Sequence, residues 1–325
     1  MNLLKRLAPL TQNQSPFGLL ILLAMAVYPP ISDNLFYIEI IKLAAIYAIF
    51  AMSWDILTGY THEVNFGFAF FIGGAGYLSG ILSSLLSVSL YLAIPIAALA
   101  AGVSGIFIGY LTLRLKGPYF AMATLAFASI LYKLSFIFYE ITGGEEGISG
   151  LDTFTDDPTK DFYVVWGAMV AIYFVLSLYA RSKHGIILKA IRADEDATQS
   201  AGINTAYYKI EAFAISGFMA GIGGGVFTHS QMHIGPTMLS GYLSVIVVLL
   251  AMIGGMGTIV GPLLGAICLS IVNESLRIVE EYRIIIYTGL LILFIYLAPD
   301  GLINLKFIKG SRLLSFIFMG DRKPT

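Results

Sequence analysis

Long uninterrupted runs of apolar residues recur along the 325-residue chain, and they limit the folds that it can adopt. A helix needs roughly 20 such residues to cross a bilayer. We place the runs at 17–30, 36–58, 64–87, 90–113, 117–139, 162–180, 210–230, 240–255, 259–273 and 284–298. They are continuously apolar rather than alternating, which indicates helices and not barrel strands. The predicted fold is an all-α polytopic membrane protein, a single transmembrane domain over 1–325 with about eight to ten membrane helices, some short or broken.

The composition excludes several other classes of protein. Hydrophobic residues make up 58% of the chain and charged residues 12%, which is about half the charged share of a soluble domain. A net charge of −1 provides no basic face for nucleic acid. The single cysteine excludes a disulfide framework and a cysteine-based metal site. We therefore expect membrane lipid around the chain and no nucleic-acid partner.

Basic residues predict the orientation, because cytoplasmic segments are enriched in lysine and arginine. Lys5 and Arg6 precede the first run, so the N-terminus is expected on the cytoplasmic side. Counting the runs forward puts 182–209 on the same side, and also the tail 300–325 if a helix break falls within 254–258. The segment 140–161 falls outside and is strongly acidic. The expected location is the cytoplasmic membrane, with several passes and both termini inside.

Glycines four residues apart indicate close helix packing, because small residues on one face let backbones approach. They occur at Gly76 and Gly80, Gly105 and Gly109, Gly217, Gly221 and Gly225, and Gly257, Gly261 and Gly265.

Ionisable residues inside the runs are few, which bears on ion coupling. Glu39 and Lys42 lie one turn apart and can pair, with no further ionisable residue nearby to extend a relay. Asp55 and Glu211 are expected near cytoplasmic helix ends, within reach of water. This pattern disfavours a proton- or sodium-coupled carrier, although backbone carbonyls at broken helices can also hold sodium.

No motif for enzyme chemistry is present. The sequence has no phosphate-binding P-loop, no His-Glu-x-x-His and no Gly-x-Ser-x-Gly. We therefore predict no catalytic residues and no nucleotide cofactor on this chain. His229 and His233 are four residues apart but lack a third ligand in register, so two ordinary interfacial histidines are favoured over a metal site.

The segment 182–209 carries the most specific local pattern. Apolar residues recur at helical spacing opposite Lys189 and Arg192, at Ile186, Ile187, Ala190 and Ile191. Asp194 is placed to cap a following helix, and Gly202 is placed to end it. An apolar stripe on a segment outside the membrane needs a lipid surface or a partner protein to cover it, although a solvated connector is the simpler alternative.

The same segment, with AIRADE at 190–195, AGIN at 201–204 and Lys209, resembles the coupling segment of the LivM-type permeases of branched-chain amino-acid ABC importers. Further stretches resemble that family in the same order along the chain. They are NFGFAFF at 65–71, RLKGPYFA at 114–121, TLAFA at 124–128, TGG at 142–144 with GI at 147–148, GGMGT at 254–258 with GP at 261–262, and PDGL at 299–302.

The resemblance implies a permease subunit in the inner membrane. It implies a second, non-identical permease, two ABC ATPase subunits that bind ATP and Mg²⁺, and a soluble substrate-binding protein. The residues expected to contact and respond to the ATPase are Ile191, Arg192, Asp194, Glu195, Ala201 and Gly202.

For the substrate pathway the candidates are Asn65, Gly67, Gly74, Thr124 and Gly255, and for docking of the binding protein they are Gly144, Glu145 and Glu146. The chain departs from the family pattern at 65–68, where a serine-leucine-glycine-histidine sequence is usual, and at Asp300, where arginine is usual. A permease for urea or short-chain amides is therefore a second interpretation. A carrier or channel that works alone, coupled to an ion gradient, is the alternative from another class.

Overall fold

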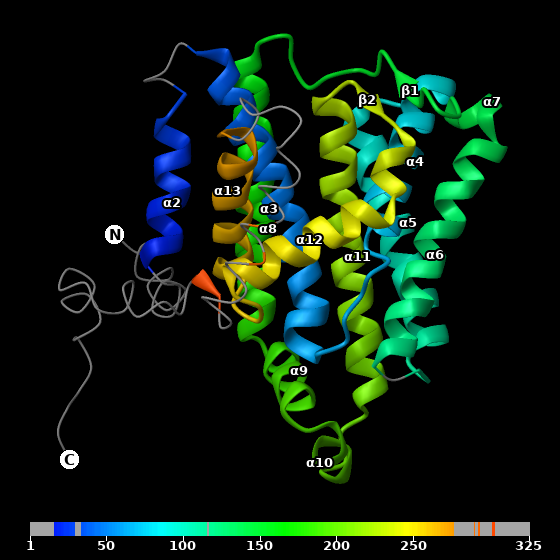
Figure 1. Ribbon diagram of the computed structural model, residues 1–325, viewed down its shortest axis with the longest axis vertical. Coiled ribbons are helices and arrows are strands. Elements are labelled where there is room, and N and C mark those ends of the chain that lie inside the picture. Colours follow the sequence, from blue (N-terminus) through cyan, green and yellow to red (C-terminus); the bar gives the residue numbers. More distant parts are fainter. Residues whose placement is uncertain are drawn as a thin grey trace.

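The computed structural model describes residues 16–29, 34–115 and 117–275, together with 289, 292, 301 and 302. Six of its helices are long and apolar enough to cross a membrane (Figure 1): α3 (Leu35–Thr61), α4 (Ala69–Leu86), α5 (Leu90–Thr112), α6 (Pro118–Ile137), α8 (Pro158–Arg181) and α11 (Thr205–Ser230). Shorter helices are α2 (Pro16–Val27), α7 (Tyr139–Thr142), α9 (Lys183–Ala193), α10 (Glu195–Ser200), the 3₁₀ helix η1 (Pro236–Leu239), α12 (Gly241–Gly254) and α13 (Val260–Ser275). The protein is a helical, multi-pass membrane protein, as predicted.

Most of the predicted runs coincide with helices, but several boundaries differ by three to five residues; α11, for example, begins at Thr205, five residues before the predicted run. The run predicted from 64 begins as a helix only at Ala69, because the preceding residues form an irregular segment. The run predicted from 162 begins at Pro158, where the Asp157 side chain caps the helix by accepting from the Thr159 backbone N–H at 2.9 Å. The run at 284–298, the tail 300–325, and Lys5 and Arg6 lie outside the described residues, apart from the single positions named above.

Helix α11 packs against α3, α4 and α5. A Cβ added at Gly224 would lie 2.1 Å from the carbonyl oxygen of Ile72, and one at Gly221 would lie 2.8 Å from the Cα of Ala98. Both positions therefore require glycine for the helices to approach this closely. Gly257 is an exception to the predicted packing face, because it lies between two helices and not within one.

The predicted break within 254–258 is present. Helix α12 ends at Gly254, and the backbone then adopts positive φ values of 116° at Gly255 and 80° at Gly257 before α13 begins. Only glycine takes up such conformations at low cost. Figure 1 shows α12 lying obliquely across the bundle, so this break joins an oblique helix to a steeper one.

The two ends of the bundle carry different structures (Figure 1). Helices α9 and α10 project beyond the long helices at one end, which we name the α10 end. The opposite end, the β end, carries α7 and a small antiparallel sheet of β1 (Ile148–Ser149) and β2 (His233–Ile234). The segment 182–209 and the acidic segment 140–161 therefore lie at opposite ends, in agreement with the predicted topology.

Lys42 is buried near the β end and joins three helices. Its Nζ lies 2.8 Å from a carboxylate oxygen of Glu39 and 2.8 Å from one of Asp161. Ser230 at the end of α11 donates a hydrogen bond of 2.8 Å to the same oxygen of Asp161. The predicted Glu39–Lys42 pair is present, but its predicted isolation is wrong. Asp161 was assigned to the acidic segment, and it is instead buried in the first turn of α8.

We expect Asp161→Asn to lower the free energy of unfolding by about 3 kcal/mol, because the buried Lys42 ammonium then keeps only the more exposed carboxylate of Glu39 as a charged partner. Thermal unfolding of the purified protein in detergent measures the change. The double variant Lys42→Met/Asp161→Asn should recover part of the loss. A midpoint for Asp161→Asn equal to that of the unaltered protein would contradict this account of Lys42.

Candidate functional site

The α9–α10 segment is held by its own caps and by an apolar face. Asp194 lies between the two helices: its backbone N–H donates to the Ala190 carbonyl oxygen at the end of α9, and its side chain caps α10 by accepting from the Ala197 backbone N–H at 2.9 Å. Leu188 and Ile191 are buried, whereas Ile186 is 62% exposed. The predicted stripe is therefore displaced, because α9 turns its Leu188 and Ile191 face toward the helices it packs against, among them α3 and α8. Gly202 follows α10 with φ of 83°, as a helix-ending glycine should.

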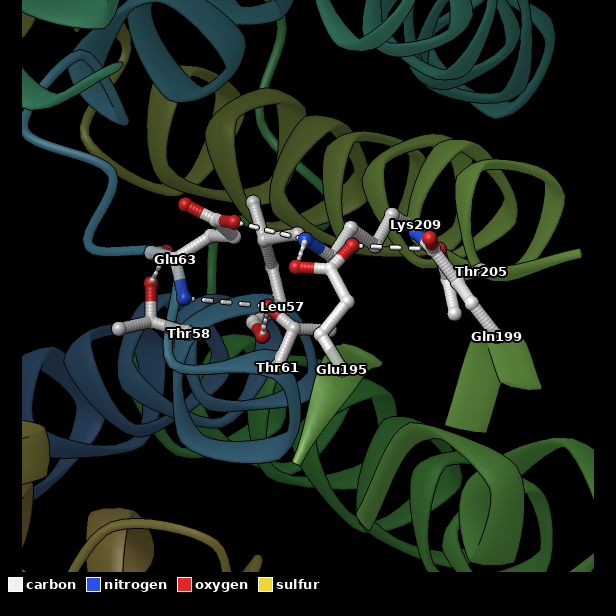
Figure 2. A network of polar contacts seen from close by, with 8 residues as sticks. All are labelled: Leu57, Thr58, Thr61, Glu63, Glu195, Gln199, Thr205 and Lys209. Carbon is white, nitrogen blue, oxygen red and sulfur yellow. Dashed lines mark hydrogen bonds and ion pairs between the residues drawn. The ribbon is translucent and has the colours of Figure 1, made fainter. Parts of the chain in front are cut away.

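Lys209 connects α10 to the segment that follows α3 (Figure 2). Its Nζ lies 2.7 Å from a carboxylate oxygen of Glu195 and 2.8 Å from one of Glu63. Thr205 donates to the second oxygen of Glu195 at 3.1 Å, and Gln199 donates to the Thr205 hydroxyl at 2.8 Å. Lys209 is 4% exposed, so the ion pairs are shielded from water. We call this arrangement the Lys209 bridge.

A second set of contacts joins α9 to the glycine break. Arg192 donates a hydrogen bond to the carbonyl oxygen of Gly59 near the end of α3. One turn earlier, a carboxylate oxygen of Asp55 accepts from the Gly257 backbone N–H at 2.7 Å. Asp55 is completely buried, so the prediction that water reaches it is wrong. Its carboxylate instead satisfies a backbone donor that the break leaves without a helical partner.

Glu211, unlike Asp55, is partly exposed near a helix end, as predicted. Its side chain is 21% exposed and lies 2.7 Å from the His184 ring, which ties α11 to α9 at the α10 end.

An apolar groove of about 600 Å³ opens beside these contacts. Its walls come from α3, α6, α12, the segment 62–66 and the glycine break: Trp54, His62, Glu63, Val64, Phe66, Gly117, Pro118, Ala121, Met122, Leu125, Val248, Met252 and Met256. Glu63 is the one carboxylate among them, and it is also part of the Lys209 bridge.

Four of the five predicted pathway residues adjoin residues that line this groove, although none of the five lines it directly. Thr124 accepts a hydrogen bond from the Phe66 backbone N–H at 3.2 Å, and the Asn65 side-chain oxygen accepts from the Gly67 backbone N–H at 2.8 Å. The Asn65 side-chain nitrogen is buried and makes no hydrogen bond within the described part of the chain. Gly255 adjoins Met256, which lines the groove. Gly74 lies apart, in a second cavity of about 300 Å³ that α6 also lines.

The predicted residues of the α9–α10 segment divide into two groups. Ile191, Arg192 and Glu195 point inward to the contacts described above, while Asp194, Ala201 and Gly202 lie exposed on the surface. Sequence reasoning did not identify Glu63, because a single acid beside a predicted span carries no periodic or spacing signal. Lys209 appeared only as the end of a motif.

At the β end, Glu145 and Glu146 are exposed in the turn between α7 and β1, and Gly144 is buried beneath them with φ of 59°. The two histidines have separate partners. His229 is buried between Ser79, at 2.8 Å, and the Asp152 carbonyl oxygen, at 2.7 Å, whereas the His233 ring lies 3.0 Å from Ser149. The expectation of two interfacial histidines is thus wrong for His229, which is fully buried.

Most of the chain is similar to known proteins. Residues 36–295 match the family described as branched-chain amino acid transport system / permease component. The chain is 30% identical over 314 residues to the high-affinity branched-chain amino acid transport system permease protein LivM of Escherichia coli K12, covering 88% of this chain and 74% of that protein.

More distant relatives include sugar permeases. The chain is 27% identical over 322 residues to the ribose import permease protein RbsC of Haemophilus influenzae, covering 90% of this chain and 94% of that protein. It is 23% identical over 266 residues to a probable branched-chain amino acid transport permease protein LivM of Methanocaldococcus jannaschii, covering 73% of this chain and 76% of that protein. No solved structure matches this chain.

We expect Gly67→Ala to destabilise the groove wall by about 2 kcal/mol through overpacking. The added Cβ would lie 1.9 Å from the carbonyl oxygen of Thr124. Helix α6 would have to shift to make room for it. Gly167→Ala in α8 is the matched control, because its Cβ meets nothing within 4 Å. Thermal unfolding should separate the two variants, and equal midpoints would show that the Gly67 contact is not close.

Proposed function

We propose that this chain, which belongs to the family of branched-chain amino acid transport system permease components, is a membrane-spanning subunit of an ABC importer for branched-chain or related amino acids. Its relatives are permease proteins by name. The observation that carries the proposal is the groove, whose Glu63 is joined to Glu195 of α10 through Lys209. On its other side, α3 bonds both to the glycine break beside Met256, through Asp55, and to Arg192 of α9, through Gly59. A solute in the groove would therefore lie close to the residues that link the groove to the α9–α10 segment.

The lining of the groove supports an aliphatic amino acid as the solute. Met122, Leu125 and Met252 offer apolar surface to a branched side chain, and full burial of such a side chain is worth about 1.5–3 kcal/mol. The Glu63 carboxylate lines the same groove and provides an acceptor for the ammonium group of such a solute. Urea, a short-chain amide or a sugar would gain little from this lining, because each needs many polar partners.

The α10 end supports contact with an ATPase. This chain has no nucleotide-binding motif, so we propose that two partner ABC subunits bind ATP and Mg²⁺ and hydrolyse the ATP. Ala201 and Gly202 are exposed at the tip of the segment and form the surface that meets them. We propose that this end and both termini lie on the cytoplasmic side of the inner membrane, and the basic residues of the segment support this orientation.

The β end supports contact with a soluble binding protein. The acidic residues gather there, and Glu145 and Glu146 are exposed where charge can steer a partner. We further propose a second, non-identical permease beside this one.

The test is reconstitution in liposomes. A tag on this chain should copurify an ATPase with a P-loop, and the complex with its binding protein should take up leucine only when ATP is supplied. Uptake by this chain alone under an ion gradient would favour the stand-alone carrier. Uptake of urea but not of leucine by the complex would favour the amide importer.

We expect Ala201→Trp to abolish copurification of the ATPase, because an indole on the exposed tip of the segment prevents close docking. The thermal midpoint of the isolated chain should be unchanged, since Ala201 is exposed. Lys160→Trp is the control, with an exposed side chain at the opposite end. Normal copurification with Ala201→Trp would remove this tip from the interface.

A further inference from the structure

The Lys209 bridge joins two surfaces that must communicate if the proposed function holds. Glu195 opens α10, whose tip meets the ATPase in that proposal, and Glu63 lines the groove. Lys209 lies between them on α11, with Nζ–oxygen distances of 2.7 Å and 2.8 Å. Along the chain, several membrane helices separate α10 from the segment after α3. The two are therefore linked here by side-chain contacts and not by adjacent backbone.

Burial makes this contact stiff. The side chain of Lys209 is 5% exposed, and those of Glu63 and Glu195 are 15% and 30% exposed. Charged hydrogen bonds shielded from water are stronger than surface ion pairs, and each carboxylate would be left with an unfavourable partial burial if the lysine moved away. A displacement of Glu195 is therefore followed by Lys209 and Glu63 more readily than it breaks the bridge.

The segment that carries Glu63 is itself braced. The Glu63 carbonyl oxygen accepts from the Thr58 hydroxyl at 2.8 Å, and the Asn65 backbone N–H donates to the same hydroxyl at 3.3 Å. At its far side, the Phe66 backbone N–H donates to Thr124 on α6 at 3.2 Å. A force on Glu63 is thus passed to Val64 and Phe66, which line the groove, and to the helix that forms its opposite wall.

We propose that Lys209 is a positioning residue that couples movement of α10 to the wall of the groove at Glu63. This inference rests on the proposed function. It adds a specific route, from Glu195 through Lys209 to Glu63, by which docking and closure of an ATPase change access to the solute.

The experiment uses the complex copurified through this chain and reconstituted with its binding protein. Leucine uptake and ATP hydrolysis are measured together, and their ratio gives the coupling. We expect Lys209→Met to lower the ratio about tenfold while ATP hydrolysis persists, in line with the size of coupling energies between distant sites. Lys209→Arg should restore most of the ratio, because arginine can still reach both carboxylates.

Two further variants test the route. Glu63→Gln and Glu195→Gln should each lower the ratio, and the double variant should lower it no further than the stronger single one, since one break already interrupts the chain of contacts. Glu211→Gln is the matched control. It removes the carboxylate that lies 2.7 Å from the His184 ring and joins α11 to α9 at the same end, but Glu211 does not line the groove. Its ratio should stay within twofold of the unaltered complex.

Hydrogen exchange provides a readout that does not depend on the solute. Binding of ATP should change exchange in residues 195–200 and in residues 62–68 together, and in Lys209→Met it should change only the former. Three results would overturn the role of Lys209. The first is an unchanged ratio of uptake to hydrolysis in Lys209→Met, and the second is an equal loss of uptake and hydrolysis in that variant. The third is a loss of the ratio in Glu211→Gln as large as that in Lys209→Met. An unaltered complex that takes up no leucine would overturn the proposed solute instead, and the exchange measurement would still decide on Lys209. Failure to copurify any ATPase would overturn both.

Discussion

Two buried lysines, each shared by two carboxylates, fasten the antiparallel helices α3 and α11 at opposite ends. Lys42 near the start of α3 binds Glu39 and Asp161, and Asp161 also accepts from Ser230 at the end of α11. Lys209 near the start of α11 binds Glu63, just beyond the end of α3, and Glu195. A charge away from water is retained only with close partners, so these two lysines fix how the central helices lie against one another.

This arrangement links the α10 end to the groove, as the proposed coupling requires. The centre of the bundle is closely packed through glycines of α11, which leaves little room for sliding between α11 and its neighbours. Movement is easier at the margins, where α12 ends in the Gly254–Gly257 break and where the segment after α3 is irregular. Both margins line the groove; Lys209 joins the segment after α3 to α10, and α3 bonds both to the break, through Asp55, and to Arg192 of α9, through Gly59. Hinges of this kind suit a permease that must open alternately to each side.

Much of the fold followed from the sequence, because apolar length and glycine or capping chemistry are local properties. The helices, the break after Gly254 and the Asp194 cap were all predictable in this way. The Lys209 bridge was not, since Glu63 and Lys209 lie 146 residues apart and neither belongs to a periodic pattern. Asp161 was misassigned for a related reason: among the acids of 140–161, only packing distinguishes the one that turns inward. Gly74 was predicted to line the pathway, but it faces a different cavity, because the sequence does not determine which way each face of α4 is turned.

The most direct test of the account is a pair of distances measured between spin labels in the assembled complex, with and without ATP. After Cys268 is replaced by serine, one label pair joins Val64 to Ser200 across the Lys209 bridge, and another joins Val64 to Met122 across the groove. The account predicts that ATP leaves the first distance unchanged and alters the second, because α10 and the groove wall move as one. A change across the bridge with a constant width of the groove would contradict it.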